Sequence, residues 1–192
     1  CLLQHINLGA CVYGDIPKAF VQGMQELCEL HSKTGVGTSG EYLTSDVDRQ
    51  VGLGMLGLSN LLRRYDVSYE QFGVALDQYI EGKTVKSPAY KLVYAIDEGI
   101  NKAAYVARQN DMVRAFAIAP TASCSYRSKD LDGYTCTPEI APPINRTVDR
   151  DSGTFGVQTY EYGDVEIASE VGWENYKRVA DGIMVLLNRT GL

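Results

Sequence analysis

Apolar side chains recur at steps of three and four residues in several segments of the chain, and this spacing predicts amphipathic helices. In the first of these segments Phe20, Met24 and Leu27 share one face. Pro17 suits the first position of that helix, because an amide hydrogen there would have no partner within the helix. The expected helices cover residues 17–32, 69–80, a longer segment that begins at Pro88, and 173–187.

Two further apolar runs predict strands. Residues 2–12 alternate enough for a short strand followed by a turn, and residues 116–119 form an apolar run of the kind found in buried strands. Residues 51–62 are almost wholly apolar and are expected to be buried, whereas residues 126–165 are rich in turn formers and are expected to be mainly loop. Strands that are separated by helices predict an α/β fold, and no linker divides residues 1–192 into two domains.

Composition narrows the class of protein. The chain has 192 residues, of which 45% are hydrophobic, and this is enough for one domain with a sizeable core. Its 24 acidic residues exceed the 18 Lys and Arg, and the net charge of −6 argues against a sequence-independent nucleic-acid surface. The sequence has no apolar run as long as a membrane span, and its five irregularly spaced cysteines do not resemble a secreted disulfide framework. A reducing, cytoplasmic location is therefore expected.

Both ends of the sequence are apolar. It begins with Cys1 inside an apolar run and stops at Leu192, soon after the last expected helix. Because natural termini are usually polar, we expect an internal or C-terminal piece of a larger protein. An N-terminal cysteine is also what protein splicing leaves on the downstream product, and that origin is an open alternative.

The run from Gly52 to Gly57 matches the dinucleotide fingerprint G-x-G-x-x-G. The fingerprint normally follows a hydrophobic strand, but residues 45–50 are mostly polar. It also needs an acidic residue about 20 positions on at a strand end, and the nearest candidates, Glu70 and Asp77, fall in or beside an expected helix. The alternative is that these glycines allow close packing of backbones in the core.

For four of the five cysteines, either a chemical role (metal binding or redox cycling) or simple packing is compatible with the sequence. Cys28 and His31 are three residues apart on one expected helix, yet two ligands do not make a metal site and a buried cysteine is usually a small hydrophobe. Cys124 and Cys136 lack the close pairs typical of zinc sites. Cys1, on the first strand, is either a packing residue or a thiol that cycles to a disulfide.

The most informative candidate site is a run of small residues rich in hydroxyl and thiol groups. It consists of Pro120, Thr121, Ala122, Ser123, Cys124 and Ser125. Such a run after a buried strand presents successive backbone amides and hydroxyls on a small footprint, which is what a phosphate group requires. A purely structural Ser/Thr turn is the alternative.

Four segments, in this order, resemble motifs in the catalytic barrel of the ribonucleotide reductase large subunit. They are Cys1 with Asn7-Leu8-Gly9-Ala10, the glycine-rich run 51–58, Ala119-Pro120-Thr121-Ala122-Ser123, and Pro138-Glu139-Ile140-Ala141-Pro142-Pro143. The likeness spans nearly the whole chain. It implies that residues 1–192 are the C-terminal half of the barrel domain, part of a ten-stranded α/β barrel, with no second domain.

The resemblance also implies an activity, the replacement of the ribose 2′-hydroxyl by hydrogen in ribonucleoside di- or triphosphates. In the family a thiyl radical on a loop cysteine removes the 3′ hydrogen, and two further cysteines supply the reducing equivalents and become a disulfide. Cys1 matches one of that redox pair. Asn7 and residues 120–125 match the substrate-binding positions. In the phosphate loop the match is Thr121, Ser123 and Ser125, together with the backbone of Ala122 and Cys124.

This sequence departs from the family pattern in two ways. Cys124 stands where many relatives carry Ser, so side-chain hydrogen bonding is weaker there although backbone contact is not affected. The sequence also lacks the Asn-x-Cys-x-Glu radical loop, the paired tyrosines of the radical relay and the C-terminal cysteine tail. The resemblance therefore implies that this piece alone is inactive.

The implied partners are the rest of the catalytic subunit, the ribonucleotide, and a thioredoxin- or glutaredoxin-type reductant. The radical source is either a metal-loaded small subunit, which we favour, or adenosylcobalamin; no metal or cofactor is expected on this piece, nor a nucleic acid or a membrane. Two other functions are open, a dinucleotide-binding dehydrogenase domain that uses Gly52–Gly57, and a non-enzymatic helical module that binds a partner through residues 138–143.

Overall fold

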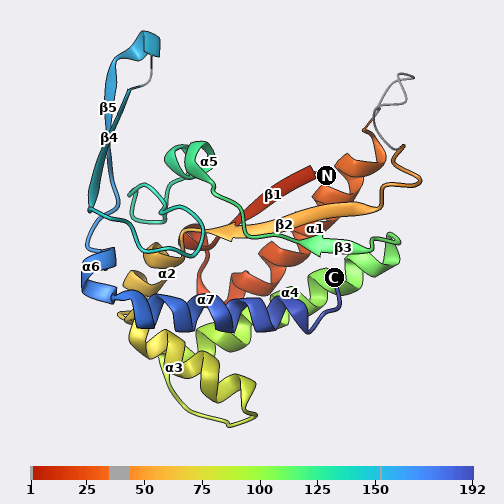
Figure 1. Ribbon diagram of the computed structural model, residues 1–192, viewed down its shortest axis with the longest axis horizontal. Helices are drawn as coiled ribbons and strands as arrows, with labels where there is room; N and C mark the ends of the chain where they lie inside the picture. The colour runs from red at the N-terminus through yellow and green to blue at the C-terminus, as the bar shows by residue number, and fades with distance from the viewer. Residues whose placement is uncertain (1, 35–43, 152) are drawn as a thin grey trace.

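A computed structural model describes residues 2–34, 44–151 and 153–192. Three strands form a parallel sheet in the order β1 (Leu2–Asn7), β2 (Gln50–Leu56), β3 (Arg114–Phe116). β1 and β2 keep one register from Leu2, opposite Val51, to Asn7, opposite Leu56. The three strands therefore end at the same edge of the sheet, where the segments that follow them lie close together (Figure 1).

Helices connect the parallel strands, and the α/β class expected from the sequence is confirmed. The long helices are α1 (Ile16–Ser32), α3 (Tyr69–Ile80), α4 (Pro88–Gln109) and α7 (Trp173–Asn188). The expected bounds of α1, α3 and α7 and the expected start of α4 are confirmed to within one residue. The short elements are η1 (Leu8–Ala10), η2 (Tyr13–Asp15), α2 (Leu58–Arg64), α5 (Ala122–Arg127), η3 (Gly153–Phe155) and α6 (Ala168–Val171). None of the described helices is both long and apolar enough to cross a lipid bilayer.

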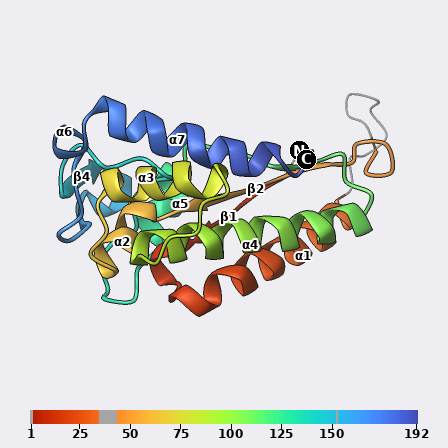
Figure 2. The same ribbon diagram turned by 90° about the horizontal axis from the view of Figure 1, so that it is seen from below.

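Three of the long helices lie on one face of the sheet, and the fourth, α3, packs against α4 and α7. Figures 1 and 2 place α1, α4 and α7 on the same side of the three strands. Gly23 lets α1 approach closely, because a Cβ there would lie 2.5 Å from Ile6 Cδ1 and 3.2 Å from Leu53 Cδ1. On the opposite face the side chain of Leu3 is 54% exposed. The sheet therefore has one face covered by helices and one face that helices do not cover.

The central strand β2 was not expected as a strand from the sequence, which predicted only that residues 51–62 are buried. Every residue from Val51 to Leu56 is buried in the structure. A strand that is buried on both faces reads as a continuous apolar run, without the alternation by which a half-buried strand is recognised.

The segment 126–165 contains a β-hairpin, so the expectation that it is mainly loop is corrected in part. Strands β4 (Thr147–Asp151) and β5 (Val157–Glu161) pair in antiparallel register and project away from the helices (Figure 1). The hairpin is mostly exposed and polar, so it carries no apolar alternation. At its base, the rings of Tyr126 and Tyr160 lie 4.8 Å apart and the Arg150 guanidinium lies 4.7 Å from the Tyr126 ring.

Candidate functional site

The ends of β1, β2 and β3, at Asn7, Leu56 and Phe116, define the carboxyl edge of the sheet. Segments that are far apart in sequence are joined at this edge by hydrogen bonds. The Gly57 amide donates to the Thr137 carbonyl at 2.8 Å, and the Glu139 amide donates to Thr121 Oγ1 at 3.0 Å. Ligands of parallel α/β sheets bind at such an edge, and most of the described candidate residues lie along it.

Asn7, expected to bind substrate, joins β1 to the segment 129–136. Its Oδ1 accepts a hydrogen bond from the Cys136 thiol at 3.0 Å, and its Nδ2 donates to the Lys129 carbonyl at 3.1 Å. Both ends of the amide are therefore occupied by the protein itself. A substrate group that reaches Asn7 has to share or replace one of these contacts, and the binding role stays a prediction.

Asn60 is a residue at this edge that the sequence analysis missed. It is fully buried, and its Nδ2 donates to Asp130 Oδ2 at 2.9 Å and to the Thr135 carbonyl at 3.0 Å. Its Oδ1 accepts from the Thr137 amide at 2.9 Å. Asn60 thus positions the segment 130–137. The one feature of the sequence that could have revealed it is that its side-chain amide stands alone within the apolar run 51–62.

The run 120–125 forms the end of a loop and most of helix α5, a correction to the expected loop, because α5 covers Ala122–Arg127. Thr121 is buried, and its hydroxyl accepts from the Glu139 amide. Ser125 is also buried, and its amide donates to the Thr121 carbonyl at 2.7 Å. Pro120 and Cys124 are exposed at the two ends of this segment. Glu139 adopts a φ of +39°, a left-handed conformation that side chains other than glycine rarely adopt.

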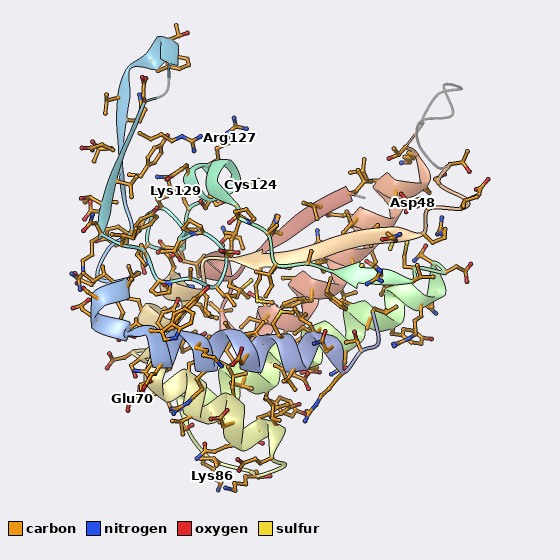
Figure 3. All side chains as sticks on the ribbon, viewed as in Figure 1. Asp48, Glu70, Lys86, Cys124, Arg127 and Lys129 are labelled. Carbon is orange, nitrogen blue, oxygen red and sulfur yellow. The ribbon has the colours of Figure 1, made fainter. Side chains whose placement is uncertain are left out.

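Two cations follow the run 120–125 and were not singled out from the sequence. Arg127 ends α5, and Lys129 lies just beyond it (Figure 3). The Arg127 side chain is exposed, and Lys129 Nζ donates to Thr135 Oγ1 at 3.0 Å. Positive charge beside a hydroxyl-rich segment favours an anion there, so these side chains belong to the candidate site.

The described thiols differ in exposure. Cys11 and Cys136 are buried near the carboxyl edge, whereas Cys124 is exposed on α5. Burial, with a contribution from the Asp130 carboxylate, raises the pKa of Cys136 to about 12. Burial also raises the pKa of Cys11. Cys11 and Cys136 therefore stay protonated at neutral pH and are poor nucleophiles.

Cys1, expected as a redox cysteine, lies outside the described residues, and its role stays a prediction. On α1, Cys28 and His31 are both buried, and His31 Nε2 lies 2.6 Å from the Asp48 carbonyl oxygen. Within residues 2–34, 44–151 and 153–192, no group of three or more His, Cys, Asp or Glu side chains is placed to hold a metal ion.

The glycines of the fingerprint Gly52–Gly57 make close contacts within the sheet. Gly52 and Gly54 lie inside β2, where a Cβ at Gly54 would lie 2.5 Å from the Ala117 carbonyl oxygen. Gly57 has a φ of +75°, and a Cβ there would lie 2.9 Å from the Gly9 amide nitrogen. A dinucleotide fingerprint needs its first glycine in the turn after the strand. The position of Gly52 within the strand does not match that context and favours the packing alternative.

The face of the sheet opposite α1, α4 and α7 carries one more polar group. His5, on β1, lies against Gly54, and its Nε2 is buried with no hydrogen-bond partner in the described part of the chain. Burial lowers the pKa of His5, so its ring is neutral at neutral pH.

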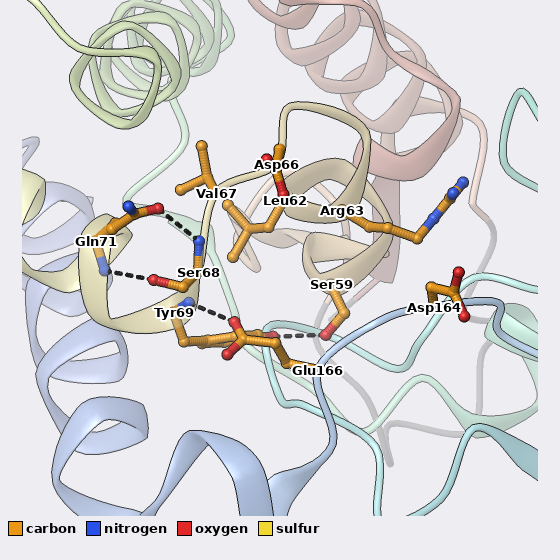
Figure 4. A pocket seen from close by; sticks show the side chains of 10 residues that line it. All are labelled: Ser59, Leu62, Arg63, Asp66, Val67, Ser68, Tyr69, Gln71, Asp164 and Glu166. Carbon is orange, nitrogen blue, oxygen red and sulfur yellow. Dashed lines mark hydrogen bonds between the residues drawn. The ribbon is translucent and has the colours of Figure 1, made fainter.

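A polar cavity of about 410 Å³ lies where α2 and α3 meet the segment 164–166 (Figure 4). Its polar groups largely bond to one another. Ser68 and Gln71 form a reciprocal cap at the start of α3, and the Tyr69 amide donates to Glu166 Oε1 at 2.6 Å. The Tyr69 hydroxyl lies 2.7 Å from Ser59 Oγ. None of the expected site residues with described side chains lines this cavity, and its contacts fix α3 to the segment before α6.

Comparison with known proteins gives no further assignment: no protein-family model and no curated protein sequence matches the chain.

Proposed function

We propose that this chain is part of the catalytic barrel of a ribonucleotide reductase large subunit. The observation that carries the proposal is that segments resembling separate family motifs meet at one edge of the sheet. Gly57 lies against Gly9, where a Cβ would lie 2.9 Å from the Gly9 amide nitrogen, and Thr121 Oγ1 accepts the Glu139 amide. Cys136 and Thr137, which directly precede the segment 138–143, bond to Asn7 and Gly57. Motifs that serve one reaction have to converge in space, and these residues do so although they are spread over much of the chain.

The one-sided sheet also supports this proposal. In an α/β barrel each strand is followed by a helix on the outside, and the inner face of the sheet lines the interior. Helices α1, α4 and α7 lie on one face of the three parallel strands, and Leu3 is exposed on the other. In the proposed barrel the face that carries Leu3 and His5 is the interior face.

The proposed reaction removes the 2′-hydroxyl of a ribonucleotide as water. Two thiols, of which Cys1 is one, supply two electrons and two protons and become a disulfide, and the carbon gains hydrogen in place of oxygen. The partner thiol, the thiyl radical and its source come from outside this chain. An external dithiol reductant then returns the disulfide to two thiols.

Substrate phosphates are held in this proposal by the segment 120–125, with Arg127 and Lys129 supplying positive charge. The Thr121 hydroxyl already accepts the Glu139 amide and remains able to donate its own hydrogen. Cys124 is exposed on the same short helix. Hydrogen bonds to an anion are stronger than neutral ones, so a few well-placed donors suffice.

The test is a complementation assay. The chain is mixed with an upstream fragment that carries the Asn-x-Cys-x-Glu loop and with the downstream tail, and conversion of ribonucleotide to deoxyribonucleotide is followed with a dithiol. Parallel reactions contain a small subunit or adenosylcobalamin. We expect product in one of them, abolished by Cys1→Ser, and the productive reaction identifies the radical source. A folded complex that gives no product in either reaction would overturn the proposal, and unchanged turnover with Cys1→Ser would remove the redox role of Cys1.

A further inference from the structure

A second cavity, of about 690 Å³, lies between η2, the end of α2 and the beginning of α4. Its walls are largely apolar and include Tyr13, Tyr65, Pro88 and Leu92. Lys86 and Lys91 also line it, and both are exposed (Figure 3 labels Lys86). The volume falls in the range of small-molecule sites, about 300–1,000 Å³, and none of the expected site residues with described side chains takes part.

The walls of this cavity are held by hydrogen bonds. The Tyr65 hydroxyl accepts the Tyr13 amide at 2.6 Å, which joins η2 to the end of α2. Ser87 caps α4 by accepting the Tyr90 amide at 3.1 Å, and the Tyr90 hydroxyl donates to the Lys83 carbonyl at 2.7 Å. The backbone on each side of the cavity is therefore fixed without a ligand, so binding requires little ordering of the protein.

The two lysines at the cavity differ from most other lysines of the chain. Four lysines form ion pairs with neighbouring carboxylates, namely Lys33, Lys83, Lys102 and Lys177. Lys86 and Lys91 have no such pair among the described residues, although the chain carries a net charge of −6. Two unpaired ammonium groups beside apolar walls make a local positive field in an otherwise acidic protein.

We propose that this cavity binds a small organic anion with an apolar body. The body packs against Tyr13, Tyr65 and Leu92, and its carboxylate, sulfonate or phosphate group is bound by Lys86 and Lys91. The tyrosines supply large apolar surfaces, and their side chains lose little conformational entropy on binding. The ammonium groups bind an anion as charge-assisted hydrogen-bond donors. This inference does not rest on the proposed reductase activity.

Anilinonaphthalene sulfonate, which has an aromatic body and one anionic group, is a suitable probe. Its fluorescence is titrated with the 192-residue chain and with the double variant Lys86→Gln/Lys91→Gln. Because the variant removes both cations, we expect the dissociation constant to rise about tenfold. The uncharged N-phenylnaphthylamine should bind the two proteins equally, because it has no group for the lysines. A dissociation constant for the sulfonate that does not change in the variant would overturn the proposal.

Two controls separate this site from general effects. The double variant Lys18→Gln/Lys102→Gln changes the net charge by the same amount at exposed positions outside the cavity lining, and it should leave sulfonate binding unchanged. Tyr13→Ala removes a wall, and it should weaken both probes while near-ultraviolet circular dichroism and the urea midpoint stay as in the parent chain. An equal loss in both lysine variants, or no effect of Tyr13→Ala, would show that the probe binds elsewhere.

Discussion

The thiol of Cys136 donates a hydrogen bond to Oδ1 of Asn7 at 3.0 Å, across 129 positions of the chain. Cys136 is fully buried, and burial together with the Asp130 carboxylate raises its pKa to about 12. The thiol is therefore a stable hydrogen-bond donor at neutral pH. It holds the start of the chain to the segment after α5, and its surroundings suit structure better than reactivity.

Alkylation rates should distinguish the exposed thiol of Cys124 from the buried thiols. Cys124 is exposed, whereas Cys11, Cys28 and Cys136 are buried, and burial raises the pKa of each of these three. With iodoacetamide at pH about 8, we expect Cys124 to react at least about tenfold faster than Cys136. Peptide mass spectrometry of timed samples measures the rates, and unfolding in urea should bring them together. Equal rates in the native chain would contradict the burial of Cys136.

Replacing Asn60 should strongly destabilise the fold. Asn60→Leu removes three hydrogen bonds and leaves the Thr137 amide and one Asp130 oxygen without that partner. We expect the free energy of unfolding to fall by about 3 kcal/mol or more. The matched control is Asn101→Leu, because Asn101 is exposed and bonds only to Asp97 of its own helix among the described contacts; it should change stability by less than about 0.5 kcal/mol. Urea unfolding measures both, and similar losses would disprove the role of Asn60.

Gly57 and Gly82 form a second matched pair. Both have positive φ, +75° and +82°, but a Cβ would lie 2.9 Å from the Gly9 amide nitrogen at Gly57 and within 4 Å of nothing at Gly82. Gly82→Ala should therefore cost about 1 kcal/mol for the left-handed conformation alone. Gly57→Ala adds a backbone clash and should cost about 3 kcal/mol. Thermal or urea unfolding gives the difference, and equal costs would mean that the close approach to Gly9 is relieved without strain.

Stability should decrease in alkaline solution. Burial raises the pKa of Tyr162 from 10.0 to about 12 and that of Cys136 from 9.0 to about 12. Between these limits the unfolded chain loses protons that the folded chain keeps, so the free energy of unfolding falls as pH rises from about 9 toward 12. Urea midpoints over this range measure the slope, which Tyr162→Phe should reduce above pH about 10. A midpoint that stays constant or rises would contradict the two shifts.

Arg127 provides a test of the phosphate-binding proposal. In the complemented enzyme, Arg127→Gln should raise KM for the ribonucleotide about threefold to tenfold with little change in kcat, because it removes a charge that attracts the phosphates. The control Lys18→Gln removes an exposed cation from α1 and should change neither constant. Loss of kcat with KM unchanged would instead assign Arg127 to the fold or to the chemical step.

The sequence predicted the long helices because their information is local. In α3, apolar residues recur with the helical period, and Ser68 and Gln71 form the cap that starts it. β2 has no such local signature, since its burial on both faces depends on α1 and on the other strands. The hairpin β4–β5 was missed for the opposite reason, because it buries too little to leave an apolar pattern.

The candidate site was predictable where its functional groups are adjacent in the sequence. The hydroxyl-rich run 120–125 was found in this way, although its helix was not. Asn60 was missed because its partner Asp130 is 70 positions away, and a lone amide in an apolar run does not reveal what satisfies it. The role of the Glu139 amide in binding Thr121 was hidden likewise, since it depends on a left-handed residue that sequence patterns do not indicate.

The hydrogen-bonded residues of the carboxyl edge lie far apart in the sequence, so during synthesis the contacts of Asn7 and Asn60 with the segment 129–137 form late. A ribosome releases β1, α1 and β2 well before the residues that satisfy the amides of Asn7 and Asn60, which lie up to 129 positions further on. Until then those two side chains are hydrated and the edge is open. The segment 129–137 therefore closes this edge after β1, α1 and β2 have been released, and α7, which adds Val179, Ile183 and Leu186 to the core, follows later still. A chain that stops before residue 128 lacks the contacts of the segment 129–137 with Asn7 and Asn60.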